Sequence, residues 1–187
     1  MQHALPGPVV ARSQVGSTAL GMEFLGGAKA VGGETSISTG TFGARDALLV
    51  FVGITGLSAA AHVHLRFNGV TTATYWHRTF SSTGLAAGLV TFANNQGPSA
   101  TYVDLEGGSS TALKRHWFVS LTNRLASSKS AFWQGTVGNS TLDPTVAITG
   151  VGEWVNTTAQ ITSVDLGTVS GTLNADCRVQ VYGRSYP

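Results

Sequence analysis

Alternation of apolar and polar residues with a period of two recurs along most of this chain, while helical periodicity is nearly absent. In the segment 62–67, Val63, Leu65 and Phe67 alternate with two histidines and an arginine. A period of two is that of a half-buried β-strand. The segment 47–54 is instead a continuous apolar run, which is typical of a strand inside a sandwich. We therefore predict a protein built from β-strands.

Turn signals divide the chain into about ten short strands. Besides the two segments above, we predict strands at 35–42, 75–80, 89–92, 101–105, 116–121, 131–137 and 146–154, followed by two runs in the tail. Alternation at 116–121 buries Trp117 and directs Phe118 to the opposite face. Many short strands separated by recurrent turns predict an antiparallel β-sandwich or barrel.

Two of the turns are predicted from their own residues. Asn68-Gly69 is a tight-turn dipeptide, because both residues accept a positive φ. In the tail, a short polar turn at 167–171 separates a β-type run from 177–183, where Cys177, Val179 and Val181 alternate with polar residues. We predict that the two runs form a closing hairpin, with Cys177 facing inward as a small apolar residue.

Composition predicts a single domain with a neutral surface. The 187 residues suffice for one domain at 22–187, preceded by an arm at 1–21 that contains proline and glycine without periodicity. Charged residues make up 11% of the chain, against about 25% in a typical soluble domain. Charge is depleted at interface cores, so this surface suits a protein that packs against copies of itself or a larger assembly. A secreted β-domain would have the same composition.

The sequence gives little support to several functional classes. The net charge of +2 comes without a cluster of lysine and arginine, so we expect no nucleic-acid partner. No apolar run is long enough for a membrane helix, and the N-terminus does not read as a signal peptide, so we expect neither membrane association nor secretory export. The single cysteine excludes an intrachain disulfide, and we interpret the sequons at Asn139 and Asn156 as products of threonine richness.

Candidate catalytic and metal-binding groups are few. His62 and His64 leave the same strand face and could offer two imidazoles to a metal, with His77 or His116 as a third ligand only through a tertiary contact. We favour a solvated polar row completed by an arginine. Asp104 and Glu106 are the only acids placed to share a strand face, and we interpret them as solvent-exposed beside a Gly-Gly turn. Nucleophile elbows and phosphate-binding loops are absent, so we expect no enzyme, no cofactor and no metal.

Aromatic residues are the better candidates for binding. Exposed aromatic side chains stack on sugars or anchor protein contacts, whereas most large aromatics belong to cores. We assign Trp117 and Trp154 to the core and leave Trp76 and Trp133 open between the two roles. Alternation does not clearly bury Tyr182 either. Tyr75, Trp76 and Trp133, together with Arg12 in the arm, are the predicted assembly or ligand contacts.

A series of short motifs runs in order from Phe24 to Gly183. The motifs are Phe24-Leu-Gly-Gly, the alternating strand 34–42, Ala44-Arg-Asp-Ala-Leu-Leu-Val, Leu65-Arg-Phe-Asn-Gly followed by Tyr75, Val119-Ser-Leu-Thr-Asn, Ser127-Ser-Lys, Trp154-Val-Asn-Thr, Ile161-Thr and a final strand ending in Tyr182-Gly. With these motifs in this order, the sequence resembles small virion structural proteins of tailed bacteriophages. It departs from their pattern at Val70, where those proteins usually have aspartate after the asparagine-glycine turn.

The resemblance implies a jelly-roll-like β-sandwich, often a trimer, located in the virion. Its leading implication is a non-enzymatic capsid decoration (cement) subunit that contacts the major capsid protein or other virion proteins and ties into its neighbours through the arm. The alternative is a tail or baseplate appendage that recognises a host surface or a glycan through exposed aromatics. A glycan hydrolase ranks third, because it would need two facing carboxylates that the sequence cannot place.

Overall fold

The computed structural model describes residues 21–82, 90–106, 114–138 and 146–187, with side chains described except at 81, 82 and 90–99. Within these ranges the protein is all-β, as predicted, and its twelve strands form two antiparallel sheets. The larger sheet runs, in spatial order, β1 (Glu23–Lys29), β12 (Arg178–Arg184), β3 (Ala47–Ile54), β8 (Lys114–Thr122), β9 (Lys129–Gly138), β10 (Val146–Trp154), β5 (Tyr75–Ser82) and β6 (Val90–Ala100). The smaller sheet runs β2 (Ser36–Ser38), β11 (Val164–Thr168), β4 (Val63–Phe67) and β7 (Val103–Asp104).

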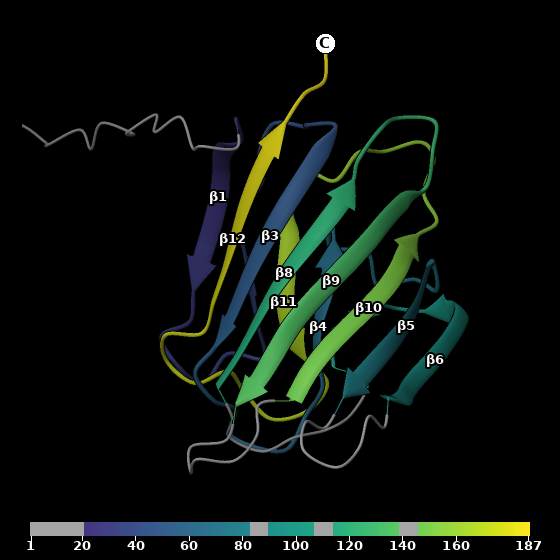
Figure 1. Ribbon diagram of the computed structural model, residues 1–187. Coiled ribbons are helices and arrows are strands. Elements are labelled where there is room, and N and C mark those ends of the chain that lie inside the picture. Colours follow the sequence, from purple (N-terminus) through teal and green to yellow (C-terminus); the bar gives the residue numbers. More distant parts are fainter. Residues whose placement is uncertain (1–20, 83–89, 107–113, 139–145) are drawn as a thin grey trace, which may run out of the picture.

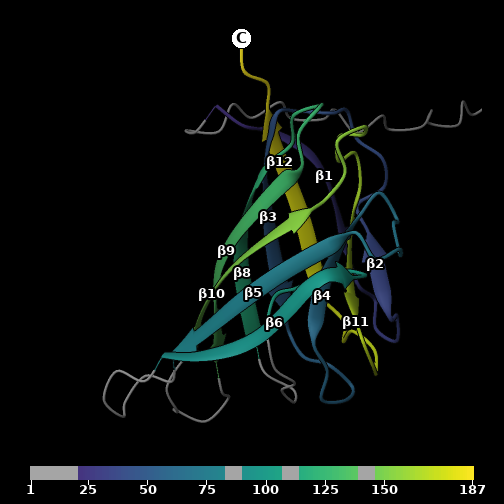
Figure 2. The same cartoon turned by 90° about the vertical axis from the view of Figure 1, so that its right-hand side faces the viewer.

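The two sheets face each other as a sandwich. Figure 1 shows the eight-stranded sheet in front with β11 and β4 behind it, and Figure 2 shows the two layers from the side. The part of the chain described contains no helix that could cross a membrane. Residues 1–20 lie outside the described part, so the predicted arm and its Arg12 are not placed.

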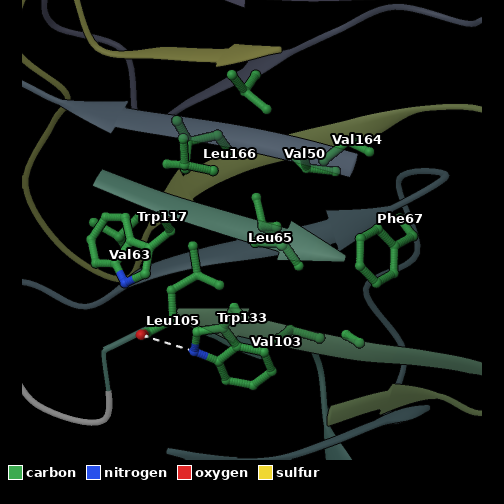
Figure 3. Close-up of a cluster of buried hydrophobic side chains, with 14 of the residues drawn as sticks. Val50, Val63, Leu65, Phe67, Val103, Leu105, Trp117, Trp133, Val164 and Leu166 are labelled. Atoms are coloured by element: carbon green, nitrogen blue, oxygen red, sulfur yellow. Dashed lines mark hydrogen bonds between the residues drawn. The ribbon is translucent and has the colours of Figure 1, made fainter. Parts of the chain in front are cut away.

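The core fills the space between the sheets because alternation directs one set of side chains inward from each strand. In β8 the residues alternate strictly between exposed and buried, so Trp117, Val119 and Leu121 point inward and Phe118 points outward. Trp117 belongs to the same core cluster as Val63, Leu65 and Phe67 of β4, which are fully buried (Figure 3). The same pattern in β12 buries Val179 and Val181, and Cys177 just before the strand is also buried, as predicted.

Both predicted turns have consequences that local sequence did not reveal. Asn68 and Gly69 have φ values of 54° and 65°, and the Val70 N–H donates to the Phe67 carbonyl over 3.1 Å, so the tight turn is confirmed. It connects β4 of the small sheet to β5 of the large sheet instead of closing a hairpin. The predicted closing hairpin is wrong, because β11 pairs with β2 and β4 whereas β12 pairs with β1 and β3. Both connections cross between layers.

Glycines make room for two tryptophans in the core. A Cβ atom at Gly150 of β10 would lie 2.1 Å from Cε2 of Trp133, and one at Gly135 would lie 2.2 Å from Cδ1 of Trp117. Each indole therefore occupies the space of a missing side chain on a neighbouring strand. The Trp133 Nε1–H also donates to the Leu105 carbonyl over 3.2 Å, which links the large sheet to the chain just after β7 (Figure 3).

Candidate functional site

The predicted aromatic contacts divide between core and surface. Trp117 and Trp154 are buried, as predicted. Tyr75 and Trp133 are fully buried as well, so their predicted role as surface contacts is corrected. Trp76 is half-buried on the outer side of β5, where its Nε1–H donates to Oε2 of Glu153 over 2.5 Å. Trp76 alone of the predicted aromatic contacts therefore remains at the surface.

Strand alternation explains why Tyr75 and Trp133 point inward. In β9, Ala131, Trp133 and Val137 share one face, and this apolar set was the signal that could have placed Trp133 in the core. In β5 the inward neighbours of Tyr75 are the polar His77 and Thr79, so no apolar stripe marked the buried face. The buried Tyr75 hydroxyl has a hydrogen-bond partner, because it accepts from the Phe67 N–H over 3.0 Å.

The outward side chains of β12, β3, β8, β9 and β10 form a surface that we call the outer face. Strand register arranges them in transverse rungs. One central rung joins Tyr182, Leu49, Ser120, Phe132 and Val151, and the next joins Gln180, Phe51, Phe118, Gln134 and Thr149. Neither set includes a formal charge. The charged side chains of the outer face lie outside these two rungs, with Arg184 and Glu153 at one end and Arg178 and Lys114 at the other.

Four rings form an aromatic row across one half of the outer face and its edge. Phe24 of β1 contacts Tyr182, Tyr182 contacts Phe51, and Phe51 contacts Phe118, with ring centroids 5.4, 5.4 and 4.9 Å apart. Every contact is edge-to-face, with interplanar angles of 63–76°, which is a favourable geometry for aromatic pairs. Phe24 and Phe118 remain 53% and 48% exposed, and Phe132 on the next strand is 47% exposed. Of these four rings, the sequence had marked only Tyr182 as an aromatic that alternation does not clearly bury.

A shallow hollow of about 420 Å³ lies at one end of the outer face. Trp76, Phe132 and Tyr186 contribute aromatic rings to its lining. Hydroxyl-bearing side chains line it as well, namely those of Ser120, Thr122 and Ser130. The hollow therefore combines ring faces with small polar groups.

A second cluster, which we call the polar seam, lies where β7 of the small sheet meets β5 of the large sheet. Nδ1 of His62 lies 2.5 Å from Oδ2 of Asp104, and the Glu106 N–H donates to Oδ1 of the same carboxylate over 2.9 Å. The Asp104 side chain is 1% exposed and that of His62 is 26% exposed. The hydrogen bond to the Asp104 carboxylate raises the pKa of His62, although its partial burial opposes the shift.

Glu106 and Arg115 form a buried ion pair beside Asp104. The Arg115 guanidinium on β8 contacts Oε1 of Glu106, and both side chains are almost inaccessible to solvent. Burial raises the pKa of Glu106 to about 8, because desolvation of the carboxylate outweighs the opposing effect of the guanidinium. Asp104 and Glu106 were expected to be solvent-exposed, and that prediction is corrected.

Histidine and tyrosine rings complete the polar seam. His64 is buried and stacks on Tyr102 with ring centroids 4.4 Å apart, and a Cβ at Gly167 would lie 2.8 Å from its Nε2. His77 on β5 is fully buried, with its ring 6.4 Å from that of Tyr102. Burial lowers the pKa of both histidines, that of His64 to about 4. The predicted solvated row at His62 and His64 is therefore wrong for His64.

The described residues contain no set of ligands for the metal site that His62 and His64 could have formed. Across 21–82, 90–106, 114–138 and 146–187, no group of three or more histidine, cysteine or acidic side chains is placed to hold a metal ion. His116 points to the opposite side of the large sheet, where it lines hollows of the outer face with Phe118. The polar seam does bring His62, His64 and His77 close to one carboxylate, but its groups contact one another. What the arrangement does chemically is hold β4, β5, β7 and β8 together through buried polar contacts.

Comparison with known proteins identifies no relative. A scan against protein-family models, a search of curated proteins and a search of solved structures each found no match.

Proposed function

We propose that this protein is a non-enzymatic structural subunit of a tailed-phage particle, most specifically a capsid decoration subunit that associates with copies of itself and with other virion proteins. The observation that carries the proposal is the outer face, where half-exposed aromatic rings lie among uncharged side chains. Large aromatic side chains on a charge-depleted surface are characteristic of the centres of protein interfaces. The ordered phage-like motifs, the jelly-roll-like sandwich and the trimer that they imply belong to the same proposal.

The buried carboxylates also favour a structural role over an enzymatic one. A hydrolase acting on glycans needs two carboxyl groups that reach the substrate across a cleft. Asp104 and Glu106 are instead committed to His62 and Arg115, and their side chains are 1% and 2% exposed. Their contacts stabilise the junction of the two sheets.

The test is the copy number of the chain in purified particles, measured by quantitative mass spectrometry against the major capsid protein. Near-stoichiometric abundance is expected of a decoration subunit. A handful of copies per particle would contradict decoration and support a tail or baseplate position. Absence from purified particles would refute the virion assignment.

A second candidate function is recognition of a host glycan by a tail appendage. The hollow lined by Trp76, Phe132 and Tyr186 favours it, because ring faces and hydroxyl groups together suit a sugar. Titration with host surface polysaccharide, followed by tryptophan fluorescence, should show saturable binding that Trp76→Ala abolishes. An unchanged titration in that variant would remove the hollow as a glycan site.

A further inference from the structure

We propose that the outer face is the contact surface between copies of this chain, with Phe118 and Phe132 at its centre. This inference rests on the proposed function as an assembling subunit and names the surface and the partner. The contact pairs the face with the same face of a second copy, so it is two-fold and distinct from the contact that would form the trimer. The sheet face is unpartnered in the single chain, and its exposed rings lie on adjacent strands.

The charge distribution of the outer face suits a second copy. Its two central rungs carry no formal charge from β12 to β10, so two such faces meet without burying a like-charge pair. The charged side chains lie toward its ends, where Arg184 and Glu153 share one flanking rung and Arg178 lies in the opposite one, with Lys114 farther along β8. Arg78 of β5 lies beside Val151, just outside the five strands of the outer face. A strongly charged partner would leave its own charges desolvated against the phenylalanine rings, which is costly.

The aromatic row is complementary to another aromatic row. Its successive rings are turned by 63–76° to one another, so the surface presents ring edges and ring faces alternately. Aromatic pairs favour the meeting of an edge with a face. A second copy supplies both features at the same strand spacing, whereas a flat sugar ring stacks on one exposed ring face at a time.

The available area is close to what a stable contact requires. The five strands of the outer face contain seven to ten residues each. With strands about 4.8 Å apart and a rise of about 3.4 Å per residue, these strands offer a face of roughly 700 Å². Stable interfaces bury about 800 Å² on each partner. The whole outer face and its aromatic edge at Phe24 must therefore take part, which places Phe118 and Phe132 in the interior of the contact.

The experiment compares self-association of the full chain with that of three serine variants by sedimentation over a concentration series. Phe118→Ser and Phe132→Ser should each raise the dissociation constant by about 30-fold or more, as expected for an aromatic residue at the centre of an interface. Leu125→Ser is the matched control, because Leu125 is 60% exposed in the connection between β8 and β9, away from the face. Its dissociation constant should equal that of the original chain.

A photo-crosslinking measurement keeps the inference testable should a serine variant fail to fold. A photoreactive phenylalanine derivative at Ser120, in the middle of the outer face, should capture a second copy, and the same group at Leu125 should not. A chain that stays monomeric at all concentrations, or equal association by the original chain and both phenylalanine variants, would overturn the inference. If the protein is abundant in particles in either of those cases, only the contact surface is wrong; absence from particles refutes the proposed function itself.

Discussion

Acid should weaken the fold through His64, and the size of the effect follows from its burial. The imidazole lies between Tyr102 and Gly167 with 3% of the residue exposed, so a proton on it would be a poorly solvated charge. Burial therefore lowers its pKa from 6.5 to about 4, and the nearby Arg66 adds to the effect while Asp104 opposes it. Between these two values the unfolded chain binds a proton that the folded chain does not.

The sign and magnitude follow from proton linkage. The free energy of unfolding contributed by His64 should fall as the pH drops from about 6.5 to 4 and should level off below that. Over this window the loss is about 3 kcal/mol, because one pKa unit corresponds to about 1.4 kcal/mol. His64→Gln removes the titrating group and keeps a polar side chain of similar reach, so the variant should lack this part of the pH dependence.

The assay is urea denaturation at several pH values, followed by fluorescence of the buried tryptophans Trp117, Trp133 and Trp154. Subtracting the curve of His64→Gln from that of the original chain isolates the contribution of His64. His62→Gln is an internal control of opposite sign. The pKa of His62 is raised by Asp104, so its contribution is fully present below its unfolded pKa and is lost as the pH rises through its folded pKa. Parallel curves for the original chain and His64→Gln between pH 7 and 4 would refute the reasoning.

Three further substitutions test the packing and the polar seam by the same denaturation assay. Gly150→Ala should cost about 3 kcal/mol, because its Cβ would lie 2.1 Å from the buried indole of Trp133, whereas Gly138→Ala, with its nearest neighbour 3.9 Å away, should be nearly neutral. Equal stabilities of these two variants would contradict the packing. Arg115→Met should cost roughly 1–3 kcal/mol, because it leaves the buried Glu106 carboxyl, whose pKa of about 8 keeps it mostly protonated at neutral pH, without its hydrogen-bond partner. Glu106→Met added to it should recover part of the loss, because it removes the unpaired polar group; no recovery would mean that the pair is not coupled. Asn123→Ala should cost roughly 2–3 kcal/mol, because its side chain donates to the carbonyls of Arg45 and Ile161 and accepts from the Ile161 N–H; a change below about 0.5 kcal/mol would refute that role.

Strand positions could be predicted well because they depend on local pattern. The predicted segments 47–54 and 146–154 coincide with β3 and β10, and 62–67 differs from β4 by one residue. A period of two places alternate side chains on opposite faces whatever the neighbouring strand is. The strand Glu23–Lys29 was not predicted, because its two glycines weaken the alternating pattern.

The candidate site was less predictable, because it combines residues that only the fold brings together. Phe118 had blurred the alternation of its segment, and it proves to be part of a row that crosses four strands from Phe24 to Phe118. Asp104 and Glu106 were predicted to be solvent-exposed because a Gly-Gly turn follows them. Burying a carboxylate is costly. Contacts with His62, 42 residues away from Asp104, and with Arg115 on β8 offset that cost, and only the fold brings these groups together.

By itself, the sequence determined that this chain is all-β, where most strands lie and which apolar side chains point inward in strands with clear alternation. These properties follow from the two-residue period and from the φ preferences of turn residues such as Asn68 and Gly69, which act over a few residues. Only the tertiary structure decided which strands pair, that β11 and β12 belong to different sheets, and that polar groups are buried in the seam while phenylalanines remain on the outer face. Pairing depends on how the faces of distant strands pack into one core, and no local pattern contains that information.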